Sequence, residues 1–145
     1  MAQYRTNVQQ LVGERNNPTT INLTTVMTSD ASTQLDGNGA VQVNTGGLYH
    51  FGFTVADIKA SGMVDHLATG LMQVTPSGGA TNTVSWTRTY NQLNASLELT
   101  TVTNAGIKNF NAGDIVTIVN YVEPLPSGNA VLTVKPETIM FMELL

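Results

Sequence analysis

The sequence predicts an all-β domain built as a sandwich or barrel of short strands. Apolar residues recur at every second position in several runs, turn-forming residues separate the runs, and threonine is abundant. A period of two places alternate side chains on opposite faces of a strand, and the branched Cβ of threonine suits a pleated surface. The length of 145 residues suits a single domain of this kind.

The strands follow one another along the chain. A first run carries Ile21, Leu23 and Met27 on one face, and a short second run carries Val41 and Val43. The clearest alternation comes next, with large apolar residues at strict spacing two: Tyr49, Phe51, Phe53 and Val55. Further runs contain Leu71 and Val74, then Val84, Trp86 and Tyr90, then Leu97 and Leu99. Several such short strands are typical of a sandwich or barrel.

The last third of the chain predicts the centre of a sheet. Residues 115–122 are nearly all apolar on both faces, which is typical of a fully buried strand. We therefore expect Ile115, Val116, Ile118 and Val119 to lie in the core. Residues 130–134 and 138–145 complete the series of strands.

Turn chemistry separates the runs. Clusters of Gly, Pro, Asn, Asp, Ser and Thr occupy residues 36–39, 45–47, 76–79 and 126–129, where they supply the φ angles that tight turns need. Helical spacing is weak, and only short helical turns are expected, one around Val8, Leu11 and Val12 and another around Val64, Leu67 and Leu71.

The composition excludes several functions. Charged residues make up 11% of the chain, against roughly 25% in an ordinary domain. Because only six residues are basic and the net charge is −4, we expect no nucleic-acid binding. The chain has no cysteine, no apolar run of membrane-spanning length and no visible signal peptide, which favours synthesis in a cytoplasm and no membrane partner.

The first 18 residues differ from the rest. They contain Arg5, Glu14 and Arg15 but few apolar side chains, and they end at Asn16, Asn17 and Pro18. The sequence therefore predicts a non-globular N-terminal arm over residues 1–18 and a folded domain over residues 19–145. Such an arm needs a neighbour to hold it.

No catalytic arrangement is evident, so we expect no enzyme activity. Neither His50 nor His66 accompanies a nucleophile motif such as Gly-x-Ser-x-Gly. No cofactor is expected. Asp30, Asp36 and Asn38 have a faint resemblance to a calcium loop, but the full spacing is absent and a turn explains them better.

Three side chains share one face of a predicted strand: Trp86, Arg88 and Tyr90. This trio suits stacking on a sugar or a base, although such residues more often lie at a core edge or a subunit contact.

The order of motifs resembles the jelly roll of the tumour necrosis factor and complement globular-head families. Those families carry a Gly-x-Tyr-x-Phe strand, matched here by Gly47, Tyr49 and Phe51. A Leu-rich strand, a Gly-Asp-x-Val strand and a closing Phe-x-Gly-x-Leu-Leu strand follow, matched by 97–99, 113–116 and 141–145. Glu143 departs from the pattern, because the family has Gly there.

The resemblance implies a homotrimer, assembled about aromatic residues of the inner sheet. On this chain the implied interface residues are Tyr49, Phe51, Tyr121 and Phe141. Compact, charge-poor jelly rolls with N-terminal arms also decorate bacteriophage heads, so the leading hypothesis is a capsid decoration (cement) protein. Its expected location is the capsid surface of a virion, and its expected partner is the major capsid protein.

The predicted arm would grip that partner through four apolar anchors: Tyr4, Val8, Leu11 and Val12. The alternative hypothesis is a receptor- or glycan-binding fibre or tip module of a virion, which would use exposed aromatic side chains such as Trp86 or Tyr90. A small enzyme on the same fold is a further alternative with no residues to support it.

Overall fold

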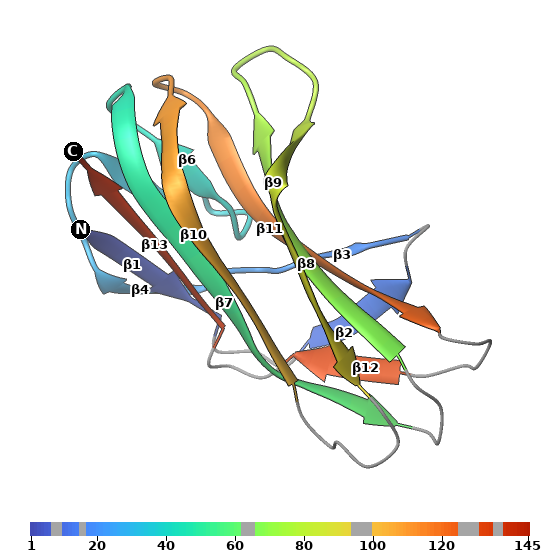
Figure 1. Cartoon of the computed structure of the whole chain (residues 1–145). Coiled ribbons are helices and arrows are strands. Elements are labelled where there is room, and N and C mark those ends of the chain that lie inside the picture. The colour runs from blue at the N-terminus through green and yellow to red at the C-terminus, as the bar shows by residue number, and fades with distance from the viewer. Residues whose placement is uncertain (7–9, 15–16, 62–65, 94–99, 125–130, 135–137) are drawn as a thin grey trace.

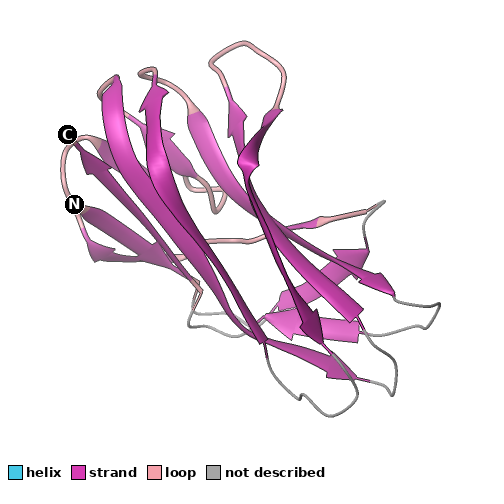
Figure 2. Ribbon diagram, viewed as in Figure 1, coloured by secondary structure: helices cyan, strands magenta, loops and turns pink. Residues whose placement is uncertain are grey.

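Two antiparallel sheets form the core of the molecule (Figure 1). The computed structural model describes residues 1–6, 10–14, 17–61, 66–93, 100–124, 131–134 and 138–145. Within these residues all regular structure is strand, as Figure 2 shows. The expectation of an all-β sandwich is therefore confirmed.

The first sheet places the N-terminal and C-terminal strands side by side. Its spatial order is β4 (Thr25–Thr28), β1 (Ala2–Arg5), β13 (Ile139–Leu144), β7 (Gly47–Ser61) and β10 (Thr100–Phe110). All neighbours in this sheet are antiparallel. The long strand β7 pairs with β13 on one side and β10 on the other.

The second sheet is built around the apolar strand of the last third. Its spatial order is β5 (Thr33–Leu35), β6 (Val41–Val43), β11 (Ile115–Pro124), β8 (His66–Thr75) and β9 (Asn82–Leu93). The two-residue strand β3 (Thr19–Thr20) also pairs with β11. Strand β11 is central, as predicted.

Two short strands join the sheets at one end. β12 (Val131–Val134) pairs with β7, and β2 (Gln10–Glu14) pairs with β12 and runs parallel to β11. On the opposite side the sandwich is open, because within the described residues β10 pairs only with β7 and β9 only with β8.

The core fills the space between the sheets with aromatic and branched side chains. From β7 the predicted alternation holds, and Tyr49, Phe51, Phe53 and Val55 are all buried. From β11 Val116 and Ile118 face them, whereas Val119 is buried in a separate small cluster. Ile115, also predicted to lie in the core, is only partly buried. Phe110 meets the rings of Tyr49 and Phe51 edge-on, with centroids 5.7 and 5.3 Å apart. Each such side chain contributes about 1.5–3 kcal/mol by leaving water.

The beginning of the chain belongs to this core, which corrects the prediction of a non-globular arm. β1 pairs with β13 and β4, and its Tyr4 is 1% exposed. The phenol oxygen of Tyr4 lies 2.7 Å from Thr33 Oγ1, and burial raises the pKa of this phenol, an effect that the Thr33 bond opposes. The strand could not be recognised from the sequence, because only two of its residues, Ala2 and Tyr4, are apolar and face the core.

Residues 10–14 also lie in a sheet of the same chain, so no domain boundary falls at residue 18. The prediction of two short helical turns is also wrong where the structure describes those residues. Leu11 and Val12 lie in strand β2, and Leu67 and Leu71 lie in strand β8. Tertiary pairing decides the conformation of such short apolar runs.

Candidate functional site

Two predicted interface aromatics lie inside the protomer. Tyr49 is 0% and Phe51 is 1% exposed, so neither has surface to offer another chain. The hydroxyl of Tyr49 donates to the carbonyl oxygens of Thr45 and Ser32, at 2.6 and 3.2 Å, which fixes the ring between the sheets. Both residues are core residues, and the prediction that they form a trimer interface is wrong.

The other two predicted interface residues lie elsewhere. Tyr121 is 7% exposed and packs with Leu71 and Val119 in a small cluster separate from the main core. Phe141 is partly exposed on the outer face of the first sheet. Of the four residues, Phe141 is the one placed where a second copy can reach it.

That outer face combines large apolar side chains with polar threonines and has few charges. Leu48 of β7 and Ile107 of β10 are 48% and 58% exposed, and Phe141 of β13 lies in the same sheet. On the described strands of this face the charged or titratable side chains are Arg5, His50 and Glu143. A flat surface of this composition suits burial against protein.

Gly52 makes the surface flat. It pairs with Phe141 on one side and Ala105 on the other. A Cβ at Gly52 would lie 2.7 Å from the ring of Phe141 and 2.6 Å from the carbonyl oxygen of Asn104. The Phe141 ring therefore covers the glycine backbone, and His50 meets the ring edge-on at 5.0 Å. His50 Nδ1 is 3.6 Å from a carboxylate oxygen of Glu143.

The open side of the sandwich carries a second feature, created by an irregularity in β9. The pairing of β9 with β8 shifts between Gly70 and Met72, which pair with Thr89 and Val84. Buried Thr87 bridges the gap in the ladder, because its Oγ1 accepts from the Met72 amide at 2.9 Å and donates to the Val84 carbonyl at 2.6 Å. Such bulges redirect the side chains next to them.

The bulge directs Trp86 across the gap from β9 to β10. Its indole lies against Gly106, where a Cβ would be 2.2 Å from an indole carbon, and meets the ring of Phe51 at 5.5 Å. Nevertheless 49% of Trp86 stays exposed. At the other end of this edge the Asn91 side-chain amide donates to the carbonyl of Thr101.

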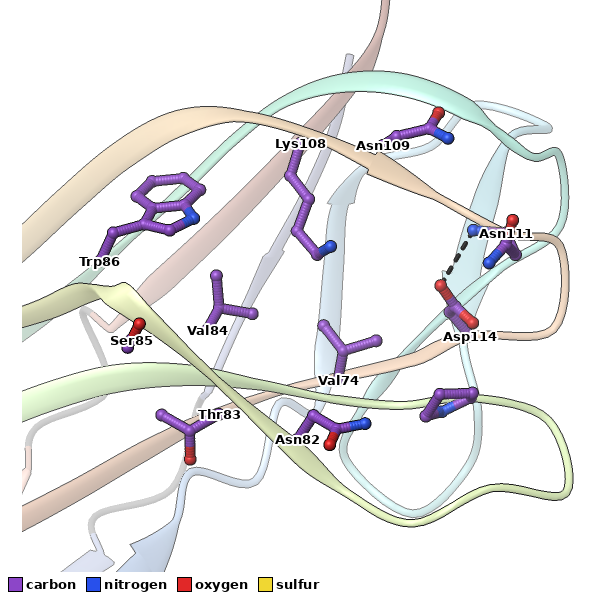
Figure 3. Close-up of a pocket in the computed structure, with 11 residues that line it drawn as sticks. Val74, Asn82, Thr83, Val84, Ser85, Trp86, Lys108, Asn109, Asn111 and Asp114 are labelled. Carbon is purple, nitrogen blue, oxygen red and sulfur yellow. Dashed lines mark hydrogen bonds between the residues drawn. The ribbon is translucent and has the colours of Figure 1, made fainter.

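A groove of about 360 Å³ opens beside Trp86 (Figure 3). Its lining is mostly polar and comes from the ends of β8, β9 and β10 and from the turn before β11: Val74, Pro76, Asn82, Thr83, Val84, Ser85, Trp86, Lys108, Asn109, Asn111 and Asp114. Arg88 and Tyr90, predicted to act with Trp86, do not line the groove; Arg88 lies within the bulge, and Tyr90 lies beyond it, paired with Thr69.

A tight turn holds the acidic end of the groove. Asp114 is 5% exposed, and its Oδ2 accepts from the Asn111 amide at 2.9 Å. The Asp114 amide donates to the Asn111 carbonyl at 3.1 Å, and Gly113 supplies the positive φ of 91° that the turn requires. Across the groove, Lys108 Nζ lies 5.4 Å from the centroid of the Phe110 ring.

The acidic residues considered for calcium are engaged in separate local contacts. Asp36 Oδ1 accepts from the amides of Asn38 and Ala40, at 2.7 and 3.0 Å, which explains the turn. Asp30 accepts from the amide and hydroxyl of Ser32 and lies 3.3 Å from the N-terminal ammonium. Among the described residues, no group of three or more His, Cys, Asp or Glu side chains converges on one point.

The predicted contact residues of the arm divide into three cases. Tyr4 is in the core, Val8 lies outside the described residues, and Leu11 and Val12 are placed by their backbone alone, paired with Thr133 and Leu132. In the described part of the chain, no helix has the length and apolar character to cross a membrane.

Comparison with known proteins identifies the fold. No family model and no curated protein sequence matches the chain. Among solved structures, the chain is similar to the Eiger TNF of S. frugiperda, with a TM-score of 0.70 and 15% identity over 99% of this chain and 91% of that one. Murine APRIL gives a TM-score of 0.64 and 15% identity, over 99% and 98% of the two chains.

The globular domain of the zebrafish complement 1qA protein is also similar, with a TM-score of 0.63 and 12% identity over 99% of this chain and 95% of that one. At these identities the likeness establishes the fold. The chain is a jelly-roll sandwich of the type found in tumour necrosis factor and complement heads, as its motifs implied.

Proposed function

We propose that this protein is a homotrimeric structural module that decorates a virion shell and has no enzymatic activity. The observation that carries the trimer is the outer face of the first sheet, where Leu48, Ile107 and Phe141 are exposed or partly exposed in a protein whose inner face is already filled. We keep the hypothesis of a trimer that the sequence suggested, but we now place the contact surface on the outer face of the first sheet and not on its inner face.

The composition of this face favours a stable contact between copies. Apolar side chains stand around a flat centre at Gly52, and few charges would have to lose their water. A stable interface buries roughly 800 Å² on each partner. In a threefold ring the contact is heterologous, so this face meets a different surface of the next copy and the ring closes after three.

The low charge content of the chain supports the proposed location on a virion shell. A chain with 11% charged residues and a net charge of −4 suits permanent neighbours better than diffusing charged ligands. The proposed neighbour is the major capsid protein of the same particle, and the proposed location is the capsid surface. His50 and Glu143 lie on the same face, with His50 Nδ1 3.6 Å from a carboxylate oxygen of Glu143, and this contact suits an interface better than acid–base chemistry.

Copy number tests this setting. Particles are purified and the protein is quantified by mass spectrometry against the major shell subunit. A decoration protein is present in numbers comparable with the shell subunits, and added protein restores heat resistance to shells that lack it. A few copies per particle would instead support the fibre or tip module, for which the half-exposed Trp86 is the favouring observation.

A further inference from the structure

We propose that the groove between β9 and β10 binds a neutral saccharide, with the indole of Trp86 as the platform for one sugar ring. This inference goes beyond the trimer, because the groove lies at the open side of the sandwich and not on the outer face of the first sheet, and it requires that the groove stay uncovered in the oligomer.

The platform is built in advance. The bulge in β9 turns Trp86 into the gap, Gly106 gives the indole room, and Phe51 supports it from the core at 5.5 Å. A side chain already held in place loses little conformational freedom when a ligand arrives. Because the face of an indole is electron-rich, it attracts the weakly positive C–H groups on the face of a sugar ring.

The walls offer the hydrogen-bonding groups that sugar hydroxyls need. Three asparagines and two hydroxyl residues line the groove: Asn82, Asn109, Asn111, Thr83 and Ser85. In Figure 3 the Asn109 carboxamide and the Thr83 hydroxyl are directed away from Trp86 and Lys108. Amides and hydroxyls both donate and accept, as sugar hydroxyls do. The Asn82 carboxamide is already positioned, because its amide nitrogen donates to the Ala80 carbonyl at 3.0 Å.

The charge and size of the groove select the class of saccharide. Lys108 and Asp114 contribute one positive and one negative side chain, so the lining carries no net charge, and the chain as a whole is negative. Anionic ligands such as nucleic acids or acidic glycans gain nothing from this arrangement. A volume of about 360 Å³ is near the lower end of small-molecule sites and suits one or two sugar rings.

Fluorescence reports directly on this site, because Trp86 is the only tryptophan in the chain. The full-length protein is titrated with lactose, maltotriose and triacetylchitotriose and screened on an array of neutral glycans, and its mass is recorded by light scattering in the same buffer. We expect a saturable change in emission with at least one neutral glycan, and no change in mass.

Variants separate the platform from general effects. Trp86→Ala, measured by calorimetry, is expected to weaken binding roughly tenfold or more, as loss of a stacked aromatic platform does. Tyr90→Ala is the matched control, since Tyr90 is an exposed aromatic of the same strand outside the groove. Asn111→Ala is expected to weaken binding while leaving the emission of the free protein unchanged.

Two results would overturn the proposal. One is the absence of saturable binding across the neutral array by folded wild-type protein. The other is dissociation of the wild-type oligomer by Trp86→Ala, which would make the groove a subunit contact. A monomeric wild-type protein that still binds a glycan through Trp86 would contradict the proposed trimer and leave the saccharide site standing.

Discussion

The two faces of the first sheet carry similar apolar residue types but differ in how far those residues are buried. On the inner face Tyr49, Phe51 and Phe53 are sealed between the sheets, whereas on the outer face Leu48, Ile107 and Phe141 remain partly open to solvent. Alternation along β7 puts Leu48 and Tyr49 on opposite sides. The difference teaches that aromatic content alone does not identify an interface. The interface candidate is the apolar surface left over after the core is complete.

The largest effect is expected on the inner side. Ile118→Asp places a carboxylate at a fully buried position of β11, with no partner for its charge. The expected cost is several kcal/mol, enough to leave little folded protein. Circular dichroism with urea unfolding measures it. Thr117→Asp, on the opposite face of the same strand, is the control and should fold. A native-like, soluble Ile118→Asp protein would mean that β11 is misplaced.

The same chemical change on the outer face should separate assembly from folding. Ile107 is 58% exposed in the protomer, so Ile107→Asp is expected to change protomer stability by no more than about 0.5 kcal/mol. Within the proposed trimer the new carboxylate would lose its water, and the trimer should dissociate into folded monomers. Sedimentation velocity measures the oligomeric state of the variant. An Ile107→Asp protein that remains a trimer would remove this face from the interface.

Gly106→Ala probes the open side, where the two sheets do not pair. The new Cβ would occupy the space of the Trp86 indole and push it outward. We expect a cost of about 1–3 kcal/mol from overpacking, together with a shift of the tryptophan emission to longer wavelength as the ring enters water. Gly78→Ala is a poor control because Gly78 has positive φ, so Ala105→Ser on the same strand serves instead. Unchanged emission would contradict the placement of Trp86.

Asn120 breaks the apolar pattern of the inner face. It is 0% exposed on β11, and neither polar atom of its side chain has a hydrogen-bond partner. Replacement by leucine removes an uncompensated desolvation cost, so Asn120→Leu is expected to raise the free energy of unfolding by roughly 1 kcal/mol. Thermal and urea denaturation test this. A loss of stability would show that Asn120 serves a polar partner, such as a bound water.

The smallest effect concerns the anchoring of β1 beside the core. Burial opposes ionisation of Asp30, but hydrogen bonds from Ser32 and the nearby N-terminal ammonium outweigh it and lower the pKa of this carboxyl below its ordinary 3.8. A lowered folded pKa stabilises the protein above the unfolded pKa, and this contribution is lost as the pH falls from about 3.8 through the folded value.

Asp30→Asn should therefore remove less than about 1 kcal/mol at neutral pH, because the contact is partly exposed. It should also flatten the stability profile in the acidic window, where the wild-type protein loses stability. Equal slopes for the two proteins between roughly pH 4 and pH 2 would contradict the assignment.

The sequence predicted the fold from local patterns, and the core of β7 and β11 lies where alternation and continuous apolar runs placed it. It failed where long-range pairing decides. β1 has two apolar side chains and looked like an arm, yet β13 and β4 flank it. Likewise, period two in β9 placed Trp86, Arg88 and Tyr90 on one face. The bulge over residues 85–88 interrupts that period, and it depends on Thr87 reaching across to β8.

The pairing of β1 and β2 within the sheets decides how attachment to a shell can be tested. Deleting residues 2–17 would remove β1 and β2 from their sheets, so the deletion would test folding before it tested attachment to a shell. Attachment is better tested with folded point variants such as those on the outer face of the first sheet.

The central claim is that the leftover apolar face drives assembly into a trimer. Light scattering coupled to size-exclusion chromatography at micromolar concentration tests it most directly. The protomer is 15.5 kDa, so we expect a single species of three times that mass. A species of 15.5 kDa with the fold intact would contradict it.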